Sequence, residues 1–269
     1  MARRKVVAVI VAHADDMEFM AGGTVARFVN EMGYDVYEYI LTDNSKGSYR
    51  LSGQELVTIS RDEAVSAGKV LGLKDVCFGD YRDSFLNEEN PNVLRGKIMG
   101  FLREVKADIV MSWDPFAPYE EHPDHRVVSM VTLEAASFAN IGLFYPEHTS
   151  SPYTVSEAYW FAKHPWNAET FVDISGVIDT KIDALLEHDC QMVLTVDGLV
   201  LEARAAGIDL PILRDVEGNG YRQVIAMGIR NFFGEIGRQA GMEYAEQFRY
   251  QKFGMLDMIL GTELIKPDF

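Results

Sequence analysis

A continuous run of aliphatic residues near the start of the chain constrains the fold more than any other feature. Residues 5–12, KVVAVIVA, carry no polar side chain after the lysine and are rich in β-branched valine and isoleucine. Such a run is typical of a strand buried on both faces of a parallel sheet, whereas a strand with one face in water alternates polar and apolar residues. The sequence therefore predicts a central strand of an α/β fold.

Further strand-like and helix-like segments alternate along the chain. In the first half we expect strands at residues 36–41, 76–78 and 108–113, and helices at 23–32, 52–71, 93–105 and 123–139. In the second half we expect strands at 158–161 and 171–174, helices at 177–187, 192–206 and 220–237, and a loop at 208–219. Because strand–helix–strand units join parallel strands, the pattern predicts a single α/β domain over residues 1–269, with a Rossmann-like, mostly parallel sheet and helices on both faces.

Charge and cysteine content limit the kinds of molecule that the protein is expected to bind and the cellular compartment in which it is expected to act. The 269 residues include 41 acidic and 25 basic side chains, which give a net charge of −16. Such a surface repels phosphate backbones and anionic lipids, so we expect neither a nucleic acid nor a membrane as partner. Cys77 and Cys190 lie in no CxxC motif and indicate a reducing cytoplasm rather than a disulfide framework. The composition leaves a homo-oligomer open.

Two clusters of histidine and aspartate follow two of the expected strands. The first strand ends in HADD, residues 13–16, and the strand at 108–113 is followed by DPFAPYEEHPDH, residues 114–125. Open parallel sheets bind ligands outside the carboxyl ends of their strands, near a switch point, so both clusters can meet at one edge. Pro123 suits the first position of a helix, which places His122 at the N-cap and His125 in the first turn.

These residue types suit a catalytic metal site. His13, Asp16 and His125 form a set of two imidazoles and one carboxylate, and three protein ligands with a fourth position open to water are typical of catalytic zinc. Asp15 and His122 remain beside this set and supply a carboxylate base and an imidazole, the groups that amide hydrolysis requires. We expect one Zn²⁺ per chain, with Fe²⁺ or Co²⁺ as alternatives that accept the same ligands. Taken alone, HADD could also be a helix-capping turn.

Motifs along most of the chain resemble the PIG-L/LmbE-like zinc-dependent de-N-acetylases. That family usually carries AHPDD after its first strand and HPDH after a later one, and the strings here are AHADD and HPDHR. Further family segments are similar to AGGT (21–24), RDEAVSAGKVLG (61–72), YRDSFL (81–86) and KIDALLEHDCQ (181–191). The resemblance covers most of residues 5–250 and is strongest to the diacetylchitobiose and N-acetylglucosamine deacetylase branch.

The resemblance implies a hydrolase that removes the N-acetyl group from an N-acetylglucosamine-type amino sugar or conjugate, giving acetate and a free amine. It implies roles for eight residues: His13, Asp16 and His125 as metal ligands, Asp15 as general base, His122 for the oxyanion and the leaving amine, Asp124 to orient that histidine, and Arg61 and Asp83 for substrate hydroxyls. Without the resemblance, Arg61 reads as a surface arginine paired with a neighbouring carboxylate such as Asp62 or Glu63.

Three positions depart from the family pattern: Ala14 stands for proline, Asn44 for a common glycine, and Cys190 for serine. None of them is a catalytic group, so they affect the identity of the substrate rather than the reaction. Two other functions stay open. A metallophosphoesterase would usually need a second metal and more carboxylate ligands, and a sugar- or metabolite-binding module would not need Asp15.

Overall fold

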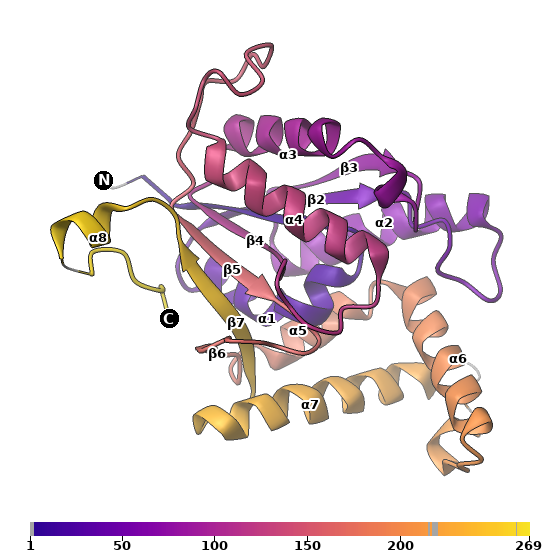
Figure 1. Cartoon of the computed structure of the whole chain (residues 1–269). Helices are drawn as coiled ribbons and strands as arrows, with labels where there is room; N and C mark the ends of the chain where they lie inside the picture. The colour runs from indigo at the N-terminus through magenta and orange to yellow at the C-terminus, as the bar shows by residue number, and fades with distance from the viewer. Residues whose placement is uncertain (1–2, 215, 217–219, 262) are drawn as a thin grey trace.

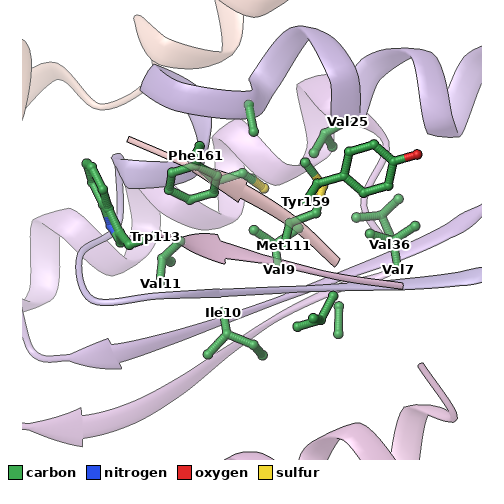
Figure 2. Packing of buried hydrophobic residues seen from close by; sticks show 14 of the residues in the cluster. Val7, Val9, Ile10, Val11, Val25, Val36, Met111, Trp113, Tyr159 and Phe161 are labelled. Atoms are coloured by element: carbon green, nitrogen blue, oxygen red, sulfur yellow. The ribbon is translucent and has the colours of Figure 1, made fainter. Parts of the chain in front are cut away.

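The strand predicted from the first aliphatic run lies inside the sheet. In the computed structural model, which describes residues 3–214, 216, 220–261 and 263–269, β1 (Val6–Val11) is buried at every position. It pairs in parallel with β2 (Asp35–Thr42) on one side and with β4 (Ile109–Trp113) on the other. Its side chains alternate between the two faces. Figure 2 shows Tyr159 and Val25 on one side of the sheet and Ile10 on the other.

The seven strands follow the order β3-β2-β1-β4-β5-β7-β6. The parallel part is extended by β3 (Asp75–Tyr81) and β5 (Glu157–Phe161), whereas β7 (Ala245–Lys252) is antiparallel to both β5 and β6 (Thr170–Asp173). The chain runs from β1 outward to β2 and β3 and then returns to β4 on the opposite side of β1. The carboxyl ends of β1 and β4 therefore form the switch point at which sheets of this kind bind ligands.

Helices cover both faces of the sheet (Figure 1). On one face α3 (Pro91–Val105) packs against α4 (Pro123–Phe138), and on the other lie α1 (Asp16–Asn30), α2 (Gly53–Leu71) and α5 (Ile178–Leu185). The later helices are α6 (Asp189–Ala205), α7 (Gly220–Ala240) and α8 (Leu256–Leu260), and short 3₁₀ turns lie at Leu86–Glu88 and Pro211–Leu213. In the part of the chain that the structure describes, no helix has the length and apolar character to span a bilayer.

The predicted fold class is confirmed, and the largest differences from the expected elements concern α1 and β7. Helix α1 begins at Asp16 rather than at residue 23, because the Asp16 carboxylate accepts the N–H groups of Ala12 and His13, both at 3.0 Å, and so turns the strand directly into a helix. The pattern does not predict β7, whose sequence AEQFRYQK is too polar to read as an inner strand. Residues 215 and 217–219 of the expected loop lie outside the described residues.

A buried ion pair anchors the middle of α1. Lys181 of α5 and Glu246 of β7 are fully buried, and the Lys181 Nζ lies 2.7 Å from the Glu246 Oε1. The Glu246 carboxylate accepts the backbone N–H groups of Gly23 and Thr24 at 2.9 and 2.7 Å. The Lys181 ammonium donates to two backbone carbonyls in the preceding turn of the same helix, at 2.8 and 2.7 Å. Helix α1, which begins at the HADD motif, is thus bonded to α5 and to β7.

Candidate active site

A cavity of about 510 Å³ opens at the carboxyl ends of β1 and β4. Its walls come from the start of α1, the segments that follow β2 and β3, the end of β4, the start of α4 and one side of α6. Six of the eight residues predicted to act in the site line this cavity: His13, Asp15, Asp16, Asp83, His122 and His125. The side chains of the HADD and HPDH motifs are therefore brought together from positions more than one hundred residues apart.

Three donor atoms of the predicted ligands converge on one point. The His13 Nδ1 lies 3.1 Å from the His125 Nε2, and the Asp16 Oδ1 lies 3.2 Å from the His125 Nε2 and 3.7 Å from the His13 Nδ1. Ligands bound tetrahedrally to zinc at about 2.0–2.2 Å are separated from one another by roughly 3.3–3.6 Å. The three separations of 3.1, 3.2 and 3.7 Å lie within about 0.2 Å of this range, so small shifts of the side chains would bring the donors to the spacing of a divalent ion of this size.

The surroundings of both imidazoles orient their lone pairs toward this point. The His125 Nδ1 lies 3.0 Å from the Glu120 Oε1, and the His13 Nε2 lies 3.3 Å from the Asp83 Oδ1 and 3.6 Å from the Asp124 Oδ2. A neutral imidazole that donates its outer N–H to a carboxylate keeps the lone pair on its other nitrogen. The remaining nitrogens, Nδ1 of His13 and Nε2 of His125, are the two that converge.

The two oxygens of Asp16 have different tasks. Its Oδ2 accepts three hydrogen bonds, from the backbone N–H groups of Ala12 and His13 at 3.0 Å and from the Trp113 Nε1 at 2.9 Å. Its Oδ1 is left to face the two imidazoles. The Trp113 ring also stacks on the His125 ring, with 3.9 Å between centroids and 12° between planes. Trp113 thus packs against two predicted ligands, which the sequence did not indicate.

Two other groupings of possible ligands occur around His13 among the described residues. One comprises His13, His122 and His125, and the other comprises His13, Asp83 and Asp124. Both include His13, but the second grouping faces its Nε2, whereas the predicted ligands face its Nδ1. The predicted set is favoured because the outer nitrogen of His13 already faces the carboxylates of the second grouping, which places those carboxylates one shell farther out.

Asp15 and His122 lie beside the three donors. Asp15 is half-buried, its side chain does not cap α1, and burial together with the adjacent charge of Asp16 raises the pKa of its carboxyl. His122 is the N-cap of α4, as predicted, and burial together with the electrostatic effect of the neighbouring His13 and His125 when these are protonated lowers its pKa to about 4. Burial opposes ionisation of Asp16, but the two imidazoles hold the pKa of its carboxyl well below the usual range.

Asp124 makes different contacts from those implied by the resemblance. Its backbone N–H, not its carboxylate, contacts the His122 ring, donating to Nδ1 at 3.2 Å. Its fully buried carboxylate accepts the backbone N–H groups of Ser84 at 2.7 Å and Leu86 at 3.1 Å and faces His13. The carboxylate of Asp124 therefore supports a different histidine from the one expected, because the first turn of α4 directs it away from the N-cap ring.

The two residues predicted to bind substrate hydroxyls are placed differently from each other. Asp83 lines the cavity, but its Oδ1 lies against His13 and its Oδ2 accepts a backbone N–H at 2.8 Å. Arg61, on α2, does not line the cavity. Its guanidinium pairs with Asp80 and lies 4.4 Å above the Phe78 ring. The position of Arg61 gives no support to a role in substrate binding and matches the alternative of a surface ion pair, with a partner on β3.

Comparisons with known proteins agree with the motifs. The family described as PIG-L, GlcNAc-PI de-N-acetylase, matches residues 8–136. Diacetylchitobiose deacetylase from Thermococcus kodakarensis is 32% identical over 192 residues, which cover 70% of each chain. The chain belongs to the PIG-L family. The resemblance drawn from the motifs is thereby confirmed.

Two further relatives extend the PIG-L match beyond the motifs. A 1D-myo-inositol 2-acetamido-2-deoxy-alpha-D-glucopyranoside deacetylase from Rhodococcus jostii is 26% identical over 256 residues, which cover 74% of this chain and 85% of that protein. The structure of N,N'-diacetylchitobiose deacetylase from Pyrococcus horikoshii, complexed with its inhibitor, superposes with a TM-score of 0.75 at 26% identity. The superposition covers 92% of this chain and 84% of the other. The whole sheet and its helices, not the two motifs alone, are thus of the PIG-L type.

Two of the departures from the PIG-L motif pattern contact each other. The backbone N–H of Ala14 donates to the Oδ1 of Asn44 at 3.2 Å, and both residues are buried. Asn44 adopts a φ of 56°, a left-handed conformation that glycine reaches easily and asparagine more often than most residues. Proline at position 14 would lack the donor, and glycine at position 44 would lack the acceptor. One hydrogen bond therefore accounts for both substitutions.

This contact predicts that the two positions are energetically coupled. Ala14→Pro alone should destabilise the protein by about 1–3 kcal/mol, because it leaves the buried Asn44 Oδ1 with only the long contact from the Thr42 hydroxyl at 3.5 Å. The Ala14→Pro/Asn44→Gly double variant should be more stable than the sum of the single variants indicates, by about 0.5–3 kcal/mol. Urea unfolding of the four proteins measures this difference. Additivity within about 0.5 kcal/mol would show that the hydrogen bond does not link the two positions.

Proposed function

We propose that this protein is a metal-dependent hydrolase that removes the N-acetyl group from an N-acetylglucosamine-type amino sugar or conjugate. The observation that carries the proposal is the convergence of three donor atoms, on His13, Asp16 and His125, within 3.1–3.7 Å of one another. The names of the PIG-L relatives support the substrate class, because both describe deacetylation of an acetamido sugar.

The proposed resident ion is Zn²⁺, held by the Nδ1 of His13, the Nε2 of His125 and the Oδ1 of Asp16, with Fe²⁺ or Co²⁺ as alternatives. When bound, a divalent ion of this kind polarises a carbonyl group and lowers the pKa of a water molecule to about 7. These three side chains would hold the ion at the wall of the cavity, where water and substrate have access to it.

The catalytic work of the protein itself is assigned to Asp15 and His122. The Asp15 carboxylate accepts a proton from the attacking water as a bond forms between the water oxygen and the acetyl carbon. The Nδ1 of His122 already accepts the N–H of Asp124, so the neutral ring carries its proton on Nε2 and donates it as a hydrogen bond to the oxyanion. As the C–N bond breaks, the proton held by Asp15 passes to the leaving nitrogen, and the products are acetate and a free amine.

We further propose that the partner is a small amino-sugar molecule and that the protein acts in the cytoplasm. The net charge of −16 supports a small uncharged or weakly charged substrate over a nucleic acid. Cys77 and Cys190 are both free, which supports a reducing compartment.

Acetate release tests the proposal directly. The protein should release one acetate per sugar from N-acetylglucosamine, diacetylchitobiose or an N-acetylglucosaminyl conjugate, and a chelator should abolish this release until Zn²⁺ is restored. The matched control is the His13→Ala/His125→Ala double variant, which should neither retain the ion nor release acetate. Absence of acetate from all three substrates with one equivalent of metal bound would contradict a deacetylase.

A further inference from the structure

Glu120 occupies a position in the loop before α4 that the sequence does not single out. The same oxygen, Oε1, lies 3.0 Å from the Nδ1 of His125 and accepts the backbone N–H of His122 at 3.1 Å. The side chain is only 6% exposed. One carboxylate oxygen therefore contacts both a proposed metal ligand and the residue proposed to hold the oxyanion.

The neighbouring glutamate shows that this placement is specific. The Glu121 side chain is 72% exposed and pairs with the Lys163 Nζ at 3.0 Å, whereas its carboxylate contacts neither histidine. Lys163 also lies 3.6 Å from the Glu120 Oε1 and lines the cavity. The positive charge of Lys163 therefore compensates part of the negative charge of the buried Glu120 carboxylate, which lies close to several other carboxylates.

We propose that Glu120 is a positioning residue that fixes the orientation of the His125 ring relative to the backbone of His122, the N-cap of α4. The Nε2 of His125 and the Nε2–H of His122 then face the same point. The inference rests on the proposed metal site but requires no particular substrate. A carboxylate on the outer nitrogen of a ligating histidine fixes both its tautomer and its ring orientation, and removal of such a partner typically lowers metal affinity about 10–100-fold. Through its contact with the His122 N–H, the same oxygen also sets the direction of the oxyanion donor.

Zinc affinity, measured without substrate, tests the proposal. Glu120→Ala, Glu120→Gln and Glu121→Gln are compared with the wild type by competition with a chromophoric chelator. We expect Glu120→Ala to bind Zn²⁺ about 10–100-fold more weakly. Glu120→Gln should fall between Glu120→Ala and the wild type, because an amide oxygen still accepts from both N–H groups but carries no charge. Glu121→Gln, which alters a neighbouring glutamate with the same lysine partner, should bind as the wild type does.

A second readout separates positioning from stability. At saturating Zn²⁺, Glu120→Gln should lower kcat for acetate release more than it changes KM, while the unfolding temperature of the metal-free protein stays near that of Glu121→Gln. If any folded Glu120 variant binds Zn²⁺ as tightly as Glu121→Gln does, the proposal is overturned. If zinc affinity falls as expected but the wild type releases no acetate, the positioning role stands and the proposed function fails.

Discussion

Asp15→Asn should keep the metal and lower acetate release by a factor of about 10²–10⁴, the usual contribution of a general base. This factor corresponds to roughly 2.7–5.4 kcal/mol of activation free energy at 1.36 kcal/mol per decade. The physical reason is that the Asp15 carboxylate lines the cavity and does not cap α1, so the amide of asparagine removes the proton acceptor and little else. Metal content and initial rates of acetate release, measured on the same preparation, provide the test.

Asp16→Asn is the matched comparison, because it makes the same aspartate-to-asparagine replacement at the adjacent position. One oxygen of Asp16 is committed to three hydrogen bonds and the other faces His13 and His125. The variant should therefore lose metal affinity, and high Zn²⁺ should restore part of its activity. No concentration of Zn²⁺ should restore Asp15→Asn. If Asp15→Asn with full metal stays within threefold of the wild type, Asp15 is not the base.

Lys181→Met should destabilise the protein by about 3–5 kcal/mol, the typical effect of removing one partner of a buried ion pair. The substitution leaves the fully buried Glu246 carboxylate without its counter-charge and leaves two carbonyls of α1 without their donor. Urea unfolding followed by circular dichroism measures the loss. Arg230→Met is the matched control, because Arg230 forms an exposed ion pair with Asp179 on the same helix as Lys181, and such pairs contribute about 0–1 kcal/mol.

Removal of both partners should be less harmful than removal of one. In Lys181→Met/Glu246→Leu neither charge of this pair remains buried, and the N–H groups of Gly23 and Thr24 still have the carbonyls of the preceding turn of α1 as acceptors. We therefore expect the double variant to regain part of the stability lost in Lys181→Met. A Lys181→Met variant within 1 kcal/mol of the wild type would show that water or a neighbouring group compensates the carboxylate.

The parallel arrangement of the first strands was predictable from the sequence, and this arrangement is what brings the two motifs together, whereas the order of the strands was not predicted. HADD and HPDH each follow a buried parallel strand, and parallel strands present their carboxyl ends at one edge. The position of His122 at the N-cap of α4 followed from Pro123, because proline is suited to the first helical position. These inferences needed only local sequence and topology.

Contacts between side chains were less predictable, because they depend on loop paths and rotamers. Asp124 follows Pro123 directly, yet the first turn of α4 sends its carboxylate toward His13 and leaves only its N–H on His122. In the sequence Glu120 resembles any acidic loop residue, and only the path of the loop in the structure places its carboxylate against His125. Spacing along the sequence cannot separate Glu120 from its exposed neighbour Glu121.

The position of β7 in the sheet affects how the protein is made. The N–H of Gly23 and the carboxylate of Glu246 that accepts it are 223 residues apart. At about 5–20 residues per second, a ribosome needs roughly 11–45 s to synthesise the intervening chain. Once residue 161 is synthesised, β5 has an unpaired edge until β7 follows, and α1 is held by Lys181 but not yet by Glu246. We therefore expect a nascent chain with every proposed site residue already synthesised to lack an ordered centre. Truncation before β7 should therefore abolish metal binding, although all the proposed ligands lie in the first half of the sequence.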